Sequence, residues 1–365
     1  MIVLHIDTEL GFRGGQRQVQ LLMRGLNARG HEQLLVAPTE SKLRAAMEAE
    51  GFATRGYDKP KLLGMRSPVL SSWLRGVVDP FHPDIVHAHS GNAHTLALSA
   101  RGGRSWKLLT TRRVDFAIKK NWFSRRKYAA PNQRYIAIST GVGDVLIAGG
   151  VKPDLIDIVH SGVEVERVIG GDREKLRGEW LRGGEGPLIG FVGALVDHKA
   201  PWILAEAAPL IREQLPNAHV VFVGDGEERA RISHIAAQHP GAITLAGWRD
   251  DIADCYAAFD LFTMPSKLEG LCTSLIDALA AGVPSIASSV GGIPDVIVDG
   301  ETGVLIPAEN PRALADAITA LWRDPFHREK YIENGRAHVK KGFNAEAMVL
   351  GTESVYTSIQ SGKSA

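Results

Sequence analysis

The chain has 365 residues, which is enough for two domains with two buried cores. Its 42 basic and 41 acidic residues leave a net charge of +1, and 44% of its residues are hydrophobic. This ordinary globular composition excludes a disordered chain and a uniformly basic nucleic-acid binder. Two cysteines, Cys255 and Cys272, exclude a disulfide framework and a cysteine-rich metal cluster, so we expect two small core thiols in a cytoplasmic protein.

The N-terminal run MIVLHIDTEL has no basic region and contains Asp7, so it predicts a first strand and no secretion signal. The longest uncharged stretch, residues 278–294, is interrupted by glycines and a proline. It is shorter than the roughly 18 apolar residues that a membrane span needs, so we expect none.

Short β-branched runs alternate with helical patterns along the chain, which predicts parallel sheets covered by helices on both faces. The expected strands are residues 2–7, 33–37, 84–88, 107–111 and 135–139, followed by 188–193, 219–224, 243–246, 261–265 and 283–287. The polar, glycine-rich stretch 165–186 between the two series predicts a domain boundary. Residues 345–359 predict a helix, but their periodicity leaves its packing partner open. Ligands of doubly wound sheets bind beyond the carboxyl ends of the strands, so the loops after the strands are the candidate sites.

The first candidate loop contains Gly14 and Gly15, which precede an apolar-periodic helix. Paired glycines at a helix start let a ligand approach unpaired N–H groups that favour negative charge. The spacing is not G-x-G-x-x-G, and no acidic residue follows the second strand in the ribose-binding place, so the dinucleotide fingerprint is absent. Taken alone, the pair is more typical of a tight strand-to-helix turn.

The second candidate loop follows residues 188–193 and contains Lys199, two residues before Pro201. Proline is preferred in the first turn of a helix, so we expect Lys199 at a helix entrance, where a phosphate would meet both an ammonium group and the helix dipole. The alternative is a solvated surface lysine.

The third candidate segment, residues 265–282, predicts a helix that ends at Gly282, with Glu269 just before it and Asp277 inside it. If both were helical, they would lie roughly 12 Å apart along the axis, beyond the roughly 5 to 9.5 Å of a hydrolytic carboxylate pair. They could instead hold hydroxyls at opposite ends of an elongated ligand whose phosphates lie over the helix N-terminus. The alternative is that Glu269 interacts only with the dipole at the helix N-terminus and that Asp277 is a solvated helix residue.

Together these segments resemble the retaining glycosyltransferases of family 4, over nearly the whole chain. The matching segments are Gly14-Gly15, 84–89 (DIVHAH), 136–139 (IAIS), 160–164 (HSGVE), 223–226 (VGDG), 247–251 (GWRDD), 269–282 and 291–295 (GGIPD). The resemblance implies an α/β protein of GT-B architecture, with two Rossmann-like doubly wound domains facing across a cleft. It implies an acceptor-side domain at 1–165, a nucleotide-sugar donor domain at 166–340, and a C-terminal helix at 341–365 that returns to the N-terminal domain.

The resemblance also assigns roles to residues. Glu269 would contact the donor sugar, Asp277 the ribose, and Lys199 the diphosphate. The N–H groups of Gly270, Leu271, Cys272 and Thr273 would hold the diphosphate from the other side. Gly14 and Gly15 would close on the phosphates or the acceptor, His89 would approach the sugar, and Trp248 and Arg249 match a loop near the nucleobase. Positive charge and helix N–H groups would stabilise the leaving diphosphate without a bound metal, so no cofactor is expected beyond a UDP, GDP or ADP sugar as donor substrate.

Several positions depart from the family pattern. Position 277 is Asp where Glu is usual, Ala194 stands where an arginine is frequent, Ala200 where glycine is common, and Asp295 where glutamate is common. We expect His87 and His89 to point to opposite faces of their strand, with His87 in the core and His89 nearer the site. Their spacing alone does not predict a metal site, and we expect none.

Residues 112–134 carry eight basic side chains against one acid, a local charge of +7. The candidate contacts are Arg112, Arg113, Lys119, Lys120, Trp122, Arg125 and Arg126. The stretch could bind anionic lipid headgroups or a phosphorylated acceptor, or it could be a solvated helix face. No nucleic-acid-binding motif accompanies it.

We therefore expect a nucleotide-sugar-dependent retaining glycosyltransferase that builds lipopolysaccharide core or another cell-surface glycan. Its partners would be the donor, a glycan or glycolipid acceptor and an anionic membrane, on the inner face of the cytoplasmic membrane. Two alternatives stay open: a nucleotide-sugar 2-epimerase-like isomerase and a non-catalytic nucleotide-sugar-binding protein. An NAD-dependent oxidoreductase is disfavoured because the glycine fingerprint is absent.

Overall fold

The computed structural model describes residues 1–59, 64–102, 104, 106–119, 121–181 and 185–361. The chain forms two compact units: Met1–Gly162 with Ala345–Ala365 is unit 1, and Val163–Asn344 is unit 2. No helix in the described part of the chain is both long and apolar enough to span a membrane.

Unit 1 contains a parallel seven-stranded sheet in the order β3-β2-β1-β4-β5-β6-β7. Its strands are β1 (Ile2–Ile6), β2 (Glu32–Pro38), β3 (Thr54–Tyr57), β4 (Ile85–Ala88), β5 (Lys107–Arg112), β6 (Gln133–Ala137) and β7 (Ile156–Ile158). Its helices are α1 (Gly14–Ala28), α2 (Lys42–Ala49), α3 (Pro68–Phe81), α4 (Gly91–Arg101), α5 (Trp122–Tyr128), α6 (Thr140–Ala148) and α15 (Ala345–Ser361). Serines that follow strands β4 and β6 start the next helices: the Ser90 and Ser139 side chains accept hydrogen bonds from the N–H groups of Ala93 and Val142.

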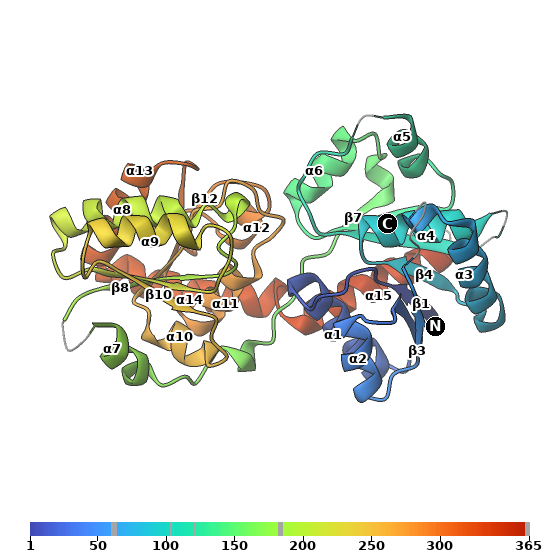
Figure 1. Ribbon diagram of the computed structural model, residues 1–365, viewed down its shortest axis with the longest axis horizontal. Coiled ribbons are helices and arrows are strands. Elements are labelled where there is room, and N and C mark those ends of the chain that lie inside the picture. The colour runs from blue at the N-terminus through green and yellow to red at the C-terminus, as the bar shows by residue number, and fades with distance from the viewer. Residues whose placement is uncertain (60–63, 103, 105, 120, 182–184, 362–365) are drawn as a thin grey trace. The chain divides into compact units, whose positions relative to one another are not determined.

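Unit 2 contains a parallel six-stranded sheet in the order β10-β9-β8-β11-β12-β13. Its strands are β8 (Leu188–Val192), β9 (His219–Val223), β10 (Ile243–Gly247), β11 (Leu261–Met264), β12 (Ser285–Ser288) and β13 (Val304–Ile306). Its helices are α7 (Arg173–Leu181), α8 (Pro201–Gln214), α9 (Arg229–Gln238), α10 (Ile252–Ala258), α11 (Thr273–Ala281), α12 (Ile293–Val296), α13 (Pro311–Arg323) and α14 (Pro325–Gly342). Helices α8, α9 and α13 lie on one side of this sheet, and α7, α10, α11 and α14 lie on the other (Figure 1).

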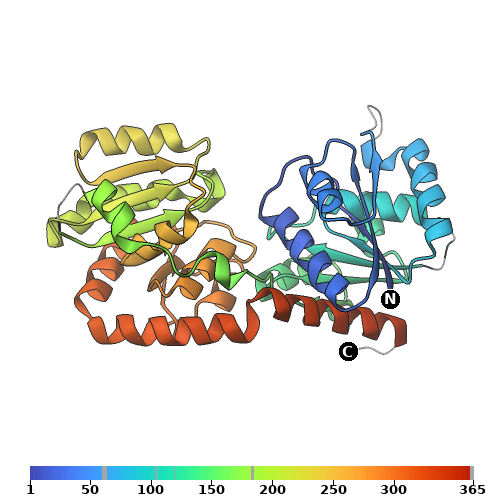
Figure 2. The same cartoon turned by 90° about the horizontal axis from the view of Figure 1, so that it is seen from below.

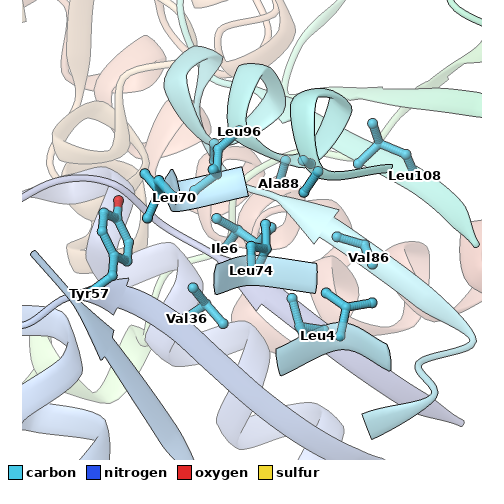
Figure 3. Close-up of a cluster of buried hydrophobic side chains, with 14 of the residues drawn as sticks. Leu4, Ile6, Val36, Tyr57, Leu70, Leu74, Val86, Ala88, Leu96 and Leu108 are labelled. Atoms are coloured by element: carbon cyan, nitrogen blue, oxygen red, sulfur yellow. The ribbon is translucent and has the colours of Figure 1, made fainter. Parts of the chain in front are cut away.

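Apolar side chains on both faces of each sheet form the cores, because a parallel sheet covered by helices is buried on both sides. On one face of the first sheet, Leu4, Val36 and Val86 meet Leu74 of α3 and Leu96 of α4 (Figure 3). The opposite face packs against α1 and α15.

Helix α15 lies alongside α1 in unit 1 (Figure 2). The two helices approach closely at Gly25, where a Cβ atom would come within 2.4 Å of Val349 Cγ2. This contact identifies the packing partner that the periodicity left open.

The ten expected strands all form, with ends that shift by one or two residues. Three short strands were not predicted: β3, β7 and β13 have three or four residues, and most of their side chains are only partly buried. The stretch 165–186 is not simply a linker, because it contains α7, whose Leu176 and Trp180 are buried in unit 2.

Candidate functional site

Both sheets reverse their strand order at one point, between β1 and β4 in unit 1 and between β8 and β11 in unit 2. Ligands of open α/β sheets bind beyond the carboxyl ends of the strands at such switch points. The loops after β8 and β11 carry Lys199 and Glu269, and those after β1 and β4 carry Asp7 and His89. Three of the predicted site residues, Lys199, Glu269 and His89, therefore follow strands that flank these switch points.

Lys199 ends a 3-10 turn, Asp197–Lys199, directly before α8. Its ammonium donates to Glu269 Oε2 at 2.6 Å, and the two side chains are 16% and 14% exposed. Burial alone would lower the pKa of Lys199, but the charge of Glu269 and this hydrogen bond raise it well above its usual range. Lys199 is therefore a charged group at a helix entrance, as predicted, and the solvated surface alternative is wrong.

The loop that carries Glu269 is fixed by hydrogen bonds on two sides. The N–H groups of Lys267 and Leu268 donate to the carbonyl of His198, at 2.8 and 3.1 Å. On the other side, the N–H of Gly292 donates to the carbonyl of Glu269 at 2.9 Å. The matched segment at residues 291–295 thus holds the loop that presents the carboxylate.

Helix α11 begins at Thr273, after a loop in which Gly270, Leu271 and Cys272 are buried. Cys272 is the N-cap residue, with φ 70° in the left-handed region, and its side chain does not cap the helix. Such a conformation is strained for a residue other than glycine, and strain of this kind concentrates at functional sites. Burial raises the pKa of the Cys272 thiol to about 11, so the thiol stays protonated at neutral pH.

Asp277 lies in the second turn of α11 and is nearly buried. Its Oδ2 accepts a hydrogen bond of 2.6 Å from Arg167, a residue that the sequence did not single out. The alternative of a solvated Asp277 is therefore wrong.

Close backbone packing shapes the end of β9, where Gly224 has φ 134°. A Cβ atom there would lie 2.0 Å from the carbonyl oxygen of Gly193, which follows β8. Only glycine lets the loops after these two strands approach in this way.

Trp248 and Arg249 follow β10. Trp248 is 79% exposed. The Arg249 guanidinium is held by Asp251, at 2.7 Å for both bonds, and by Glu179 at 3.2 Å. The structure thus uses this arginine in a cluster of ion pairs within unit 2.

In unit 1, Gly14 and Gly15 form the first turn of α1. A Cβ atom on Gly15 would lie 3.7 Å from Cδ of Arg113, so the glycine pair and this arginine are neighbours. Arg113 donates to Ser161 Oγ at 3.3 Å, and burial lowers its pKa to about 10 despite the opposing charge of Asp7. Gln18 holds the same loop through two hydrogen bonds with the backbone of Gly162.

The expectation that His87 and His89 point to opposite faces is wrong. Their ring centroids are 4.0 Å apart, and His5 of β1 lies beside both rings. Residues two apart along a strand share a face because side chains alternate. Burial lowers the pKa of His5 to about 3 and holds the pKa values of His87 and His89 well below their usual range, so all three rings are neutral at pH 7.

The hydrogen bonds of this cluster define proton positions. The Gln33 amide N–H donates to the carbonyl of Met23, so its oxygen accepts from His5 Nε2 at 3.1 Å. His5 Nδ1 must then accept from His89 Nε2, at 2.9 Å. This series of hydrogen bonds leaves His89 Nδ1 unprotonated, buried and without a partner among the described residues.

Ligand atoms of His5, His87 and His89 all lie within 4.8 Å of one another, a spacing that could suit a metal. Both nitrogens of His87 are already bonded, to Tyr356 and Thr111 at 2.7 Å, and both of His5 are bonded as described above. The donor set therefore fits a chain of neutral imidazoles better than a metal site.

The basic stretch divides into two parts. Arg112 is used internally, because it donates to Tyr128 Oη and to the carbonyl of Phe116. Lys119, Arg125 and Arg126 are exposed, together with Trp122 and Phe123, which are 63% and 55% exposed. Lys120 lies outside the described residues.

Two doubly wound parallel units, with a lysine and helix N-termini at a switch point, are typical of proteins that bind nucleotides. A model of glycosyl transferases group 1 matches residues 172–338, and a model of Glycosyltransferase Family 4 matches residues 12–167. The chain belongs to this family of glycosyltransferases, which has the GT-B fold and uses nucleotide-sugar donors.

Individual relatives agree with this assignment. The GDP-mannose-dependent alpha-mannosyltransferase of Mycobacterium tuberculosis is 30% identical over 358 residues, covering 89% of this chain and 88% of the relative. The lipopolysaccharide core biosynthesis glycosyltransferase LpsE of Rhizobium meliloti is 25% identical, covering 92% and 93%. Anabaena HepE in complex with UDP has the same fold, with a TM-score of 0.86 at 18% identity, covering 98% of this chain and all of that one.

Proposed function

We propose that this protein is a retaining glycosyltransferase that moves a sugar from a nucleoside diphosphate to a hydroxyl of a glycan or glycolipid. Its product would belong to lipopolysaccharide core or another cell-surface polysaccharide. The observation that carries the proposal is the charged Lys199 at the start of α8, paired with Glu269 just before α11. A cation and two helix starts at one switch point suit a diphosphate.

In the proposed reaction the bond between the anomeric carbon and the diphosphate oxygen breaks, and a bond to the acceptor oxygen forms on the same face. The acceptor proton leaves with the diphosphate. Lys199 and the N–H groups of residues 270–273 stabilise the negative charge that grows on the diphosphate, and this kind of stabilisation is usually the largest catalytic effect. Glu269 accepts hydrogen bonds from the sugar hydroxyls. These protein groups need no bound cofactor.

Further donor contacts are assigned as part of the proposal. Asp277 binds the ribose, and the loop of Trp248 and Arg249 lies near the nucleobase. Arg249 is held by two carboxylates, whereas Trp248 donates its indole N–H to Asp250 at 3.2 Å and is 79% exposed. The ring face of Trp248 is therefore the more accessible surface for a base. Unit 2 is thus the donor unit.

Unit 1 is the acceptor-side unit in this proposal. Gly14, Gly15 and Arg113 lie together and form a place where a phosphate or another anionic group could bind. The unprotonated Nδ1 of His89 is suited to accept a hydrogen bond from a sugar hydroxyl.

We assign the exposed part of the basic stretch to anionic lipid on the inner face of the cytoplasmic membrane. Helix α5 presents Arg125, Arg126 and Trp122 to solvent, and Lys119 lies just before it. Each basic residue near an anionic surface contributes about 1 kcal/mol. Flotation with vesicles containing phosphatidylglycerol tests this assignment. Arg125→Ser with Arg126→Ser removes about 2 kcal/mol and should weaken binding about thirtyfold, and unchanged binding would refute the assignment.

The test of the catalytic proposal is release of UDP, GDP or ADP from the corresponding nucleotide sugars in the presence of truncated lipopolysaccharide acceptors. The product is analysed by NMR at the anomeric carbon. We expect transfer with the donor's anomeric configuration kept. Inversion, or conversion of the donor to an epimer without acceptor, would contradict the proposal.

A further inference from the structure

Arg167 lies at the end of the 3-10 turn η3 (Val165–Arg167), close to the first residue of unit 2. The turn is closed by hydrogen bonds from the N–H groups of Arg167 and Val168 to the carbonyls of Glu164 and Val165. Val168 is buried and anchors the turn. The arginine therefore extends from a fixed backbone.

From this turn Arg167 Nη2 donates to Asp277 Oδ2 at 2.6 Å. The Arg167 side chain is 36% exposed, whereas that of Asp277 is only 8% exposed. A nearly buried carboxylate is stable in its charged form only when a cation or strong hydrogen bonds accompany it. Arg167 supplies both, from a segment 110 residues away in the sequence.

Asp277 is one methylene shorter than glutamate, so its carboxylate group has less reach and its direction matters more. A bond to one oxygen from a guanidinium on a fixed turn restricts the rotation of the carboxylate. The orientation of the second oxygen is then determined as well.

We infer that Arg167 is a positioning residue for donor binding: it holds Asp277 charged and in one rotamer, so that the carboxylate can accept hydrogen bonds from the ribose hydroxyls of a nucleoside diphosphate. This inference rests on the proposed donor site in unit 2. Arg167 itself touches neither the sugar nor the reacting atoms. It determines how strongly the site distinguishes ribose from deoxyribose.

The experiment is calorimetric titration of the full-length protein with UDP, GDP and ADP, each beside its 2′-deoxy and 3′-deoxy counterparts. The measured quantity is the ratio of the dissociation constants of the deoxy and ribo forms. For the wild type we expect a ratio of about 10 or more for at least one hydroxyl, the size of a hydrogen bond to a charged group. Arg167→Met should bring this ratio close to 1, Arg167→Lys should restore it in part, and Asp277→Asn should remove it.

Two variants separate positioning from a general loss of structure. Arg231→Met removes an arginine from another ion pair of unit 2, with Glu206, and should leave the ratio unchanged. Arg167→Lys keeps the positive charge beside Asp277, so it takes the place of Arg167→Met in the titration if Arg167→Met does not fold.

Three results would overturn the inference: an unchanged ratio in Arg167→Met, tighter nucleotide binding in that variant, or a ratio near 1 in the wild type. Tighter binding would mean that Arg167 competes with the ribose for Asp277. The absence of any nucleotide binding by the wild type would instead refute the proposed function itself.

Discussion

The ion pair between Lys199 and Glu269 predicts that neutralising Glu269 has opposite effects on binding and on catalysis. In the structure the Lys199 ammonium is already engaged by the carboxylate at 2.6 Å. In the proposed donor site, a diphosphate would therefore compete with Glu269 for the charge of Lys199. The substitution Glu269→Gln removes the competitor and keeps the size of the side chain.

The magnitudes follow from the burial of the pair, whose side chains are 16% and 14% exposed. Unit charges about 4 Å apart interact by about 4 kcal/mol at an effective dielectric constant near 20, and part of this is offset by desolvation. We expect Glu269→Gln to lower the free energy of unfolding by about 2 kcal/mol. Release of Lys199 should tighten the binding of the free nucleoside diphosphate about tenfold, which corresponds to about 1.4 kcal/mol. Transfer should fall at least tenfold, because the proposed charged hydrogen bond from the sugar to Glu269 is lost.

The pH dependence of the stability effect follows from the raised pKa of Lys199. A group whose pKa is higher in the folded state gives its full stabilisation below its unfolded pKa, which is about 10.4 for lysine. That stabilisation is lost only as the pH rises through the folded pKa. The stability difference between wild type and Glu269→Gln should therefore be equal at pH 7 and pH 9.

Urea unfolding measures the stability of Glu269→Gln, calorimetry its nucleotide affinity and product release its rate. Glu206→Gln, which breaks the more exposed pair with Arg231, is the control and should change each quantity little. Weaker binding of the nucleoside diphosphate by Glu269→Gln would refute the reasoning, since it would mean that Glu269 assists the diphosphate site.

Three other predictions concern packing, acid stability and proton positions. Gly224→Ala should destabilise the protein by about 3 kcal/mol in urea unfolding, because its Cβ would lie 2.0 Å from a carbonyl oxygen. Gly247→Ala, whose added Cβ has no atom of the described residues within 4 Å, should cost about 1 kcal/mol, and equal effects would contradict the packing argument. Burial lowers the pKa of His94 to about 3, so below pH 6.5 the unfolded state binds a proton that the folded state does not. The free energy of unfolding should therefore fall by up to about 1.4 kcal/mol for each unit by which the pH is lowered. His94→Gln should make this pH dependence shallower, and an unchanged pH dependence would count against the role of His94. Gln33→Glu should favour a charged His5 and move the His89 proton from Nε2 to Nδ1. Nitrogen-15 NMR of the imidazole rings detects this change, and a spectrum identical to that of the wild type would exclude the proposed series of hydrogen bonds.

The larger elements of the fold follow from the sequence because long apolar runs in parallel sheets are buried on both faces. The strands at β3, β7 and β13 were missed since their three or four residues carry too weak an apolar pattern. The polarity of segment 165–186 predicts a domain boundary, although Trp180 packs on Phe259 and joins α7 to unit 2. Short or amphipathic elements depend on partners that local sequence does not reveal.

At the site, the sequence predicted the places of Lys199 and Glu269 but not their ion pair. The two residues are 70 positions apart, and their contact depends on how two loops dock. Arg167 was missed for the same reason, since its partner Asp277 comes from a distant helix. The grouping of His87 with His89 could have been predicted, because a two-residue spacing places both rings on one face of a strand.

The most direct test of the central claim is a thermal-shift panel of UDP, GDP, ADP and CMP with their sugar conjugates. It compares wild type, Lys199→Ala and the control Lys341→Ala, which changes an exposed lysine on α14. At 100 times its dissociation constant a ligand adds about 2.7 kcal/mol of stability, which the melting temperature reveals. We predict that one nucleoside diphosphate and its sugar conjugates stabilise wild type and Lys341→Ala but not Lys199→Ala. Equal stabilisation of all three proteins, or of none, would contradict the assignment of Lys199 to a diphosphate site.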